Sequence, residues 1–520
     1  MQLDKLLILI LLIAFLVRIF PLGFPSFTSD EARVAFRGYS LATSGKDELG
    51  RSFPLFFNSS TDYQFPLVSY LTAAGELVFG KNDLGVRIPF ILISTLLVFV
   101  TYKIAEFFNN NRLFKLSSAF LVASNPVLIF LSKIPNEIIV LTTLFAWLFL
   151  LLVKQQKLMI IAVVMILTVL TSKLSLFFLI PFTYLTLFKQ KKQAVILAMI
   201  IVALGLILFF SNEQARRSFI ENNFSLFSDV TVKNGIDKLR GYGYEAGWPK
   251  FIDFVLFNKL HYLSIGLLHW LSYFSPVLYS GQLDPSGLLN YFSLGAWTKI
   301  LIIPFLLGLL HLIRAKTNAK FLIGYAVLFT FPALFNYPKL DLTLIILSMP
   351  FIALVMSFSL LKLNRLAVIL IFCIVIPELF LNIYDVVPQE KNSVDLRPNW
   401  VSGLVTNIDQ TAKSETTLVS DDIVSDIGPL IEWYTNFNPQ DGFEQLKSPY
   451  KFTQYQIGKV RLLGAQQIFT TCGIEEKIII YASPRDLKKI KRDFKPIIDS
   501  TYSDSNNKIR VYKITNTCIR

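Results

Sequence analysis

Long apolar runs recur along the first three quarters of this chain, and they constrain its fold more than any other feature. The runs 88–102 and 141–153, for example, carry no charged residue. Uninterrupted apolar segments of about 17–25 residues have the length of membrane-spanning helices. Charged residues make up 17% of the chain, below the roughly 25% of soluble domains. The pattern excludes a soluble globule, a coiled coil and a disordered chain, and the lack of alternation excludes an outer-membrane β-barrel.

We therefore predict an α-helical polytopic membrane protein with roughly eleven transmembrane helices within residues 1–387. Lys5 precedes the first run and no small-residue cleavage site follows it, so we expect a helix that is retained. The expected spans are 6–20, 86–108, 116–133, 137–153, 158–171, 174–188, 194–211, 296–313, 321–336, 341–360 and 366–386.

Lys and Arg gather in every second loop between these spans, which places those loops in the cytoplasm. The clusters are Lys103/Arg112/Lys115, Lys154/Lys157, Lys189/Lys191/Lys192, Arg314/Lys316/Lys320 and Lys362/Arg365. The pattern predicts a multi-pass protein of the plasma membrane with a cytoplasmic N-terminus. It also predicts three large extracytoplasmic segments, at 23–85, 211–295 and 388–520.

Residues 251–279 are ambiguous, because a single span there would reverse the side of every later loop. We favour amphipathic helices lying on the outer surface, in contact with membrane lipids.

The tail differs in character from the rest of the chain. Strand-like runs at 417–419, 477–481 and 508–514 surround a helix-like segment at 484–493. Residues 388–520 are thus predicted to form a small soluble α/β domain outside the membrane.

The net charge of +14 does not indicate nucleic acid. Acidic and basic residues nearly balance in the tail, so the excess belongs to the membrane part, where the positive-inside rule explains it. No Gly-rich phosphate loop, HExxH or CxxC motif is present, and the three histidines are too dispersed for a metal site by spacing. We predict no metal and no cofactor. Cys472 and Cys518 could pair if the tail is extracytoplasmic.

Two adjacent carboxylates, Asp30 and Glu31, follow the first span closely. Ionisable groups near lipid are costly to hold and are candidates for function. Thr28-x-x-Glu31 is also the pattern of a capping box at the start of a helix. Both interpretations can hold together, with Glu31 capping the helix and Asp30 facing substrate.

A third acid, Glu137, begins a helix after a short outer loop. The helix dipole favours a carboxylate at that position whatever its function, and Lys133 beside it could be an interfacial anchor. Asp30 and Glu137 are nevertheless expected on the same side of the membrane, where they could converge in one cavity.

These segments resemble the GT-C membrane glycosyltransferases, in particular glycosyltransferase family 39, the protein O-mannosyltransferase-like family, and its aminoarabinose lipid A transferase relatives. The matching stretches are 28–89 with Asp30-Glu31, 43–48 and Asp62-Tyr63, then Ser124-x-Pro126, Ser132-Lys133 to Glu137, 273–276 and Gly281-x-x-Asp284-Pro285. The resemblance extends over nearly the whole membrane part and does not reach the tail.

The resemblance implies hexosyl or pentosyl transfer from a polyprenyl-phosphate sugar to a protein, glycan or lipid acceptor at the extracytoplasmic face. It assigns Asp30 as the general base and Glu137 as the second carboxylate of the site. The residues expected to bind substrate are Glu31, Asp62, Tyr63, Gln64, Lys133 and Arg87. Gln64 stands where the family usually has a basic residue for the donor phosphate, so Lys133, Arg87 or Arg240 would have to supply the charge.

Two alternatives remain open from the sequence. A lipid-linked glycan transporter or flippase would favour charges within spans and an internal repeat, whereas the prominent acids here lie at span ends. A non-catalytic scaffold that presents the 388–520 domain would explain the loss of the basic residue at Gln64.

The predicted topology can be tested with cysteine labelling in intact cells. In a background whose native cysteines are replaced by serine, Ser414→Cys should react with a membrane-impermeant thiol reagent and Lys157→Cys should not. Labelling at position 157 but not at 414 would contradict the orientation.

Overall fold

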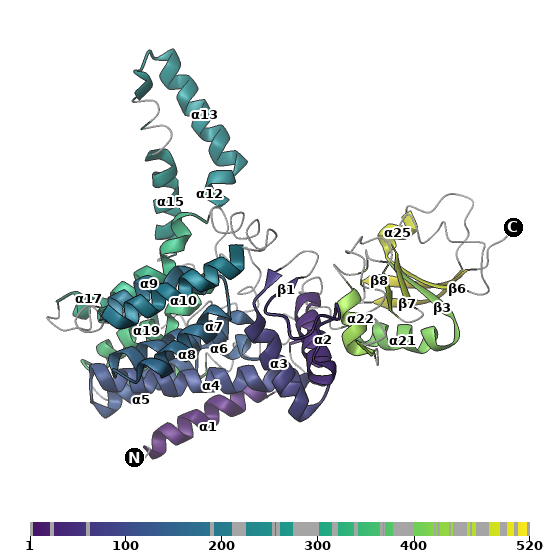
Figure 1. Cartoon of the computed structure of the whole chain (residues 1–520), viewed down its shortest axis with the longest axis horizontal. Coiled ribbons are helices and arrows are strands. Elements are labelled where there is room, and N and C mark those ends of the chain that lie inside the picture. Colours follow the sequence, from purple (N-terminus) through teal and green to yellow (C-terminus); the bar gives the residue numbers. More distant parts are fainter. Residues whose placement is uncertain are drawn as a thin grey trace.

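A computed structural model of the chain shows a mostly helical protein with a small C-terminal sheet (Figure 1). The structure describes residues 4–20, 25–58, 63–187, 192–210, 225–251, 255, 260–273, 301–314, 321–336, 342–363, 368, 370–377, 400–420, 423, 427–435, 438–439, 455–457, 460–463, 478–488, 497–503 and 508–516. Cys472, Cys518 and their suggested pairing lie outside these residues, as does Asp62.

The helical body contains a long series of apolar helices, and a two-stranded ribbon, β1 (Phe57–Asn58) with β2 (Tyr63–Gln64), sits beside it. Its helices are α1 (Lys5–Ile19), α2 (Ser29–Ser44), α3 (Pro66–Phe79), α4 (Asp83–Phe108), α5 (Arg112–Ala123), α6 (Pro126–Leu131), α7 (Glu137–Val153), α8 (Leu158–Val169), α9 (Leu174–Leu187), α10 (Lys192–Phe210), α17 (Ile302–Arg314), α18 (Phe321–Thr330), the 3-10 turn η4 (Phe331–Leu334) and α19 (Leu342–Leu360).

Two of the described helices, Asp83–Phe108 and Thr343–Leu360, are long and apolar enough to cross a membrane by themselves. Most of the other apolar helices are shorter. The expected span 116–133 is not one continuous helix, because α5 ends at Ala123 and α6 begins after Asn125, whose side chain accepts from the Leu128 N–H at 2.9 Å. Pro126 lacks an N–H and suits the first position of that new helix. The total number of spans stays a prediction.

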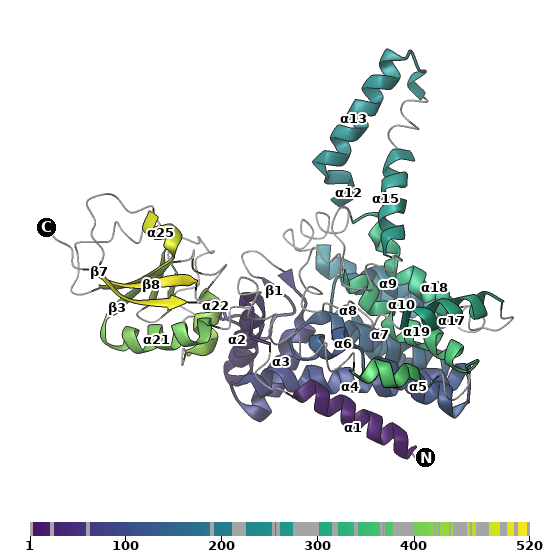
Figure 2. The same ribbon diagram turned by 180° about the vertical axis from the view of Figure 1, so that it is seen from behind.

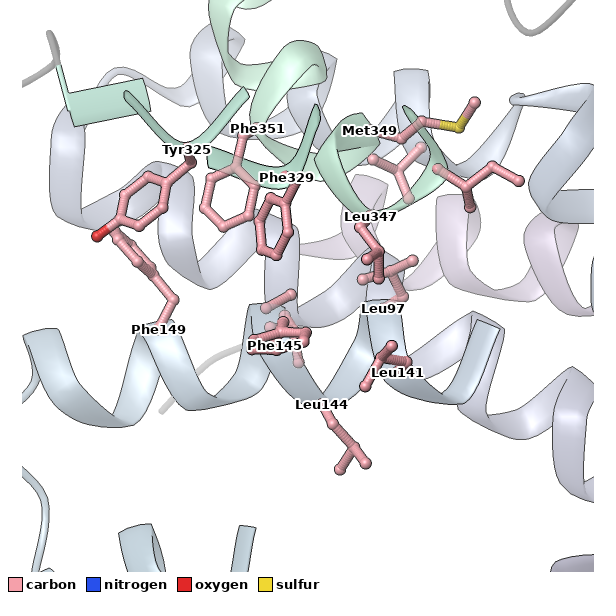
Figure 3. Close-up of a cluster of buried hydrophobic side chains, with 14 of the residues drawn as sticks. Leu97, Leu141, Leu144, Phe145, Phe149, Tyr325, Phe329, Leu347, Met349 and Phe351 are labelled. Carbon is pink, nitrogen blue, oxygen red and sulfur yellow. The ribbon is translucent and has the colours of Figure 1, made fainter. Parts of the chain in front are cut away.

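Aromatic rings fill the centre of the helical body (Figure 3). Phe145 on α7 lies 5.1 Å from Phe182 and 5.3 Å from Phe329, centroid to centroid, both in edge-on geometry. Phe149, one turn further along α7, meets Tyr325 at 5.3 Å and Phe351 at 5.5 Å. Rings from α7, α9, α18 and α19 therefore interlock, and this contact joins sequence-distant helices.

Small residues let α2, α3 and α4 approach closely. A Cβ at Gly38 would lie 2.6 Å from the Thr72 side chain, and one at Gly75 would lie 2.1 Å from the backbone oxygen of Gly85. Glycine is required where backbones come this near. The three helices thus form one tight unit in the segment predicted to lie outside and to enter the next span.

The C-terminal part is an α/β domain, as predicted. Its six-stranded sheet has the order β4-β5-β3-β6-β8-β7, with β5, β3 and β6 parallel and the other pairs antiparallel. Figure 2 shows this domain beside the helical body. The strands are β3 (Thr416–Ser420), β4 (Tyr455–Ile457), β5 (Val460–Leu463), β6 (Ile478–Ala482), β7 (Ile497–Ser503) and β8 (Ile509–Asn516), with helices α21 (Val401–Ser414), α22 (Gly428–Tyr434) and α25 (Pro484–Lys488). Its extracytoplasmic location stays a prediction.

Helices α12 (Ser225–Ser228), α13 (Val230–Glu245) and α15 (His261–Ser272) form an arm that projects from the helical body (Figures 1 and 2). α15 contacts the body through η4 near the base of the arm. The arm lies within the predicted outer segment 211–295, and only α15 falls in the ambiguous stretch 251–279. The placement of that stretch on the membrane surface stays a prediction.

The ring cluster predicts a strong dependence of stability on Phe145. Because Phe145 is fully buried, Phe145→Ala should leave a cavity and lower the free energy of unfolding by about 3–5 kcal/mol. Phe107→Ala is the matched control, since that ring on α4 is 49% exposed. Thermal unfolding of the detergent-purified chain measures both, and equal effects would contradict the packing.

Candidate active site

A capping box starts α2, as the sequence pattern predicts. The Thr28 hydroxyl accepts from the Glu31 N–H at 3.3 Å, and the Glu31 carboxylate accepts from the Thr28 N–H at 3.1 Å. Glu31 is buried, so its carboxylate satisfies backbone groups of the helix start. Its expected role in substrate binding stays a prediction.

Asp30 takes no part in this capping box and points outward. Its side chain is 77% exposed and lies 3.8 Å from the Arg33 guanidinium, one turn along α2. An exposed carboxylate in the first turn is favoured by the helix dipole. An external ligand can therefore reach Asp30, whereas its neighbour Glu31 is used structurally.

Arg37 lies two turns from Asp30 on the same side of α2 and contacts Gln64, where the sequence lacks the family's basic residue. It is fully buried, and its Nη1 donates to Gln64 Oε1 at 2.6 Å. Its Nε donates to the two Glu48 carboxylate oxygens at 2.8 and 2.9 Å, its Nη2 also contacts Glu48, and the guanidinium lies 4.6 Å from the Phe57 ring centre. A cation on α2 thus reaches the Gln64 side chain on strand β2.

Sequence reasoning missed Arg37 and Glu48. The spacing 30, 33, 37 puts three charged residues on one side of a helix, which was a usable signal. Burial would raise the pKa of the Glu48 carboxyl, but the charge and hydrogen bonds of Arg37 lower it below its ordinary value. Glu48 therefore stays ionised and paired.

Asp47 organises the turn that carries Glu48. It accepts from the backbone N–H of Leu49 at 3.1 Å and of Arg51 at 2.8 Å, and from Arg51 Nε at 2.7 Å. Asp47 is fully buried. The two acids of this part of the first outer segment are thus structural, and neither competes with Asp30 for a catalytic role.

Lys133 and Arg87 hold the chain between α1 and α2. Lys133 Nζ donates to the Phe20 carbonyl at 2.7 Å, and Arg87 Nη2 donates to the Pro25 carbonyl at 2.6 Å. Both cations are buried, and Lys133 is near enough to Arg87 and Arg18 for their charges to interact. Basic groups gather here, close to the start of α2, but their role toward a phosphate stays a prediction.

Glu137 is the first residue of α7 and is half-buried. Asn136 provides the cap, because its side chain accepts from the Ile139 N–H at 3.0 Å. Since α7 packs along α4 while α2 packs against α3 and α22, different neighbours hold the two acids. The convergence of Asp30 and Glu137 stays a prediction.

The other predicted residues lie in the ribbon and in the projecting arm. Tyr63 pairs with Asn58 and Gln64 with Phe57 in β1 and β2. Arg240, on α13 in the projecting arm, lies 3.9 Å from Asp237. Within the described residues, no group of three or more His, Cys, Asp or Glu is placed to hold a metal ion.

Residues 63–212 match the family model described as dolichyl-phosphate-mannose-protein mannosyltransferase. The resemblance to GT-C glycosyltransferases is confirmed. The matched residues include Gln64, Arg87, Lys133 and Glu137, and Asp30 precedes them. No curated protein is significantly similar in sequence to the chain.

Solved structures with a related arrangement include ArnT from Cupriavidus metallidurans bound to undecaprenyl phosphate, at 13% identity and a TM-score of 0.45 over 98% of each chain. The Archaeoglobus fulgidus oligosaccharyltransferase in complex with Zn and sulfate has 14% identity and a TM-score of 0.46, covering 83% of this chain and 61% of its own.

The buried pair of Arg37 and Glu48 predicts how the free energy of unfolding changes when one or both residues are replaced. Arg37→Met leaves the Glu48 carboxylate buried without its counter-charge and should cost about 3–5 kcal/mol of unfolding free energy. Adding Glu48→Gln removes that charge and should recover much of the loss. Denaturation in detergent measures both variants, with Arg240→Met as the exposed control. A double variant no more stable than Arg37→Met would contradict the pairing.

Proposed function

We propose that this chain is a multi-spanning membrane glycosyltransferase that moves a sugar from a polyprenyl-phosphate carrier to an acceptor at the extracytoplasmic face. The observation that carries the proposal is that the two adjacent acids at the start of α2 have different surroundings. Glu31 completes the cap, and Asp30 beside it is exposed. The family match over residues 63–212 supports lipid-phosphate-linked sugar transfer.

A membrane setting is supported by the outward side chains of α1. Leu6, Ile8, Leu9, Leu12, Ile13 and Leu16 are each 46–53% exposed. A contiguous apolar surface of this kind is unusual on a soluble protein and suits contact with lipid. We propose residues 1–387 as the membrane part and 388–520 as the extracytoplasmic domain, with the plasma membrane as the location.

The chemistry needs one base and one cationic region. The acceptor hydroxyl gives its proton to the Asp30 carboxylate as its oxygen bonds to the anomeric carbon of the sugar. The bond from that carbon to the phosphate oxygen breaks, and the electron pair leaves with the polyprenyl phosphate. Protonation equilibrium then returns Asp30 to its ionised form.

The cations Lys133 and Arg87 flank the segment that leads into α2, so we propose that they favour the leaving phosphate electrostatically. Arg37 would fix Gln64, which could offer its amide to the phosphate oxygens. This arrangement replaces the basic residue that the family usually has at the Gln64 position. Glu31, Asp62 and Tyr63 remain proposed substrate contacts, and Glu137 the proposed second carboxylate.

The base can be tested by Asp30→Asn. Asparagine keeps the size of aspartate and ranks with it as a helix-terminal residue, but it cannot take a proton. Transfer from labelled polyprenyl-phosphate mannose, with polyprenyl-phosphate aminoarabinose as an alternative donor, should fall by about 10²–10⁴-fold. The chain's unfolding temperature should be unchanged.

Asp237→Asn is a closely matched control. Asp237 is 73% exposed and lies 3.9 Å from an arginine three residues later, as Asp30 does at 77% and 3.8 Å. It is expected to transfer sugar at the parent rate. A loss below about tenfold for Asp30→Asn would remove Asp30 from the role of base.

A further inference from the structure

Lys81, in the turn between α3 and α4, reaches a helix of the C-terminal domain. Its Nζ donates to the Thr435 carbonyl at 2.7 Å and to the Glu432 carbonyl at 3.1 Å. Both carbonyls belong to the end of α22. The lysine and its acceptors are more than 350 residues apart in sequence, so this contact joins two domains.

α22 has a physical need for such a partner. A helix leaves its last carbonyls without partners inside the helix, and a cation near that end is favoured by the dipole. Lysine side chains commonly hydrogen-bond these last carbonyls. Here the cation that does so comes from another domain.

The same ammonium lies among aromatic rings of both domains. It is 5.0 Å from the ring centre of Tyr39 and 5.7 Å from that of Phe36, both on α2, and 5.7 Å from Trp433 on α22. A cation over ring faces is attracted to them. Burial lowers the pKa of Lys81 to about 8, opposed by the charges of Glu76 and Glu432, so the ammonium is largely protonated at pH 7.

α22 also packs directly against the start of α2. The Trp433 ring packs edge-on against Phe27, with the ring centroids 5.9 Å apart. Ala32 and Ala35 on α2 share one buried cluster with Leu430 and Ile431 of α22. These contacts lie on both sides of Asp30 in the sequence.

We propose that Lys81 is a positioning residue: by capping α22 it holds the C-terminal domain against α2, and this docking sets the direction of the Asp30 carboxylate. The inference rests on the proposed sugar transfer for its catalytic consequence. The C-terminal domain then becomes part of the working site.

Lys81→Met in the full chain tests the proposal, because methionine keeps the length of the side chain and removes its charge. At saturating polyprenyl-phosphate mannose we expect kcat to fall roughly 10–100-fold, the scale of a small misplacement of a reacting group. KM for the donor should change by less than about twofold. Hydrogen exchange of the backbone over residues 28–37 should rise.

Three further variants test the same contact. Lys81→Arg retains a cation that can donate to both carbonyls, and it should restore most of kcat and of the exchange protection. Lys413→Met removes a lysine that is 72% exposed on the same domain and should match the parent in every measurement. If Lys81→Met does not fold, Trp433→Leu weakens the same contact from the other side and should give the same pattern.

The outcomes separate the two proposals. Unchanged exchange over residues 28–37, or faster exchange with unchanged kcat, overturns positioning by Lys81. A parent chain that transfers no sugar from either donor refutes the proposed function. The exchange data then decide the docking alone, with faster exchange in Lys81→Met but not in Lys413→Met supporting it and no difference overturning it.

Discussion

The placement of α2 depends above all on the buried pair of Arg37 and Glu48. A guanidinium without solvent is costly unless charge and hydrogen bonds compensate it, and Glu48, Gln64 and the Phe57 ring together provide that compensation. Since these partners come from the loop after α2 and from the ribbon, pairing with them ties the ribbon to the helix. The close contact between Gly38 and Thr72 then fixes the position of α2 against α3.

Once α2 is placed, adjacent acids have different roles. Glu31 faces back to the Thr28 N–H and is buried, while Asp30 faces out with Arg33 beside it. Asp47 accepts a backbone hydrogen bond that holds a turn, and Glu48 pairs with Arg37. Among these four acids, Asp30 is thus the one that combines exposure with a place at the helix start.

The C-terminal domain also contacts α2. Its helix α22 meets α2 and the α3–α4 turn, with Lys81 at their junction. The contacts of α22 with α2 and with the α3–α4 turn join the C-terminal domain to the same group of helices that holds Asp30. The family model matches residues 63–212 and does not reach this domain.

The sequence by itself determined the helical class, the α/β tail, the capping box at Thr28 and the resemblance confirmed over residues 63–212. Each depends on local composition, on residue spacing or on a family motif. It did not reveal that the run 116–133 is divided into two helices, because hydropathy does not detect the Asn125-Pro126 cap between them. Only the tertiary structure decided that Arg37 reaches Gln64 and that Lys81 caps α22. Those contacts join residues 27 and more than 350 positions apart, and no local pattern specifies which distant carbonyl or carboxylate a buried cation will find.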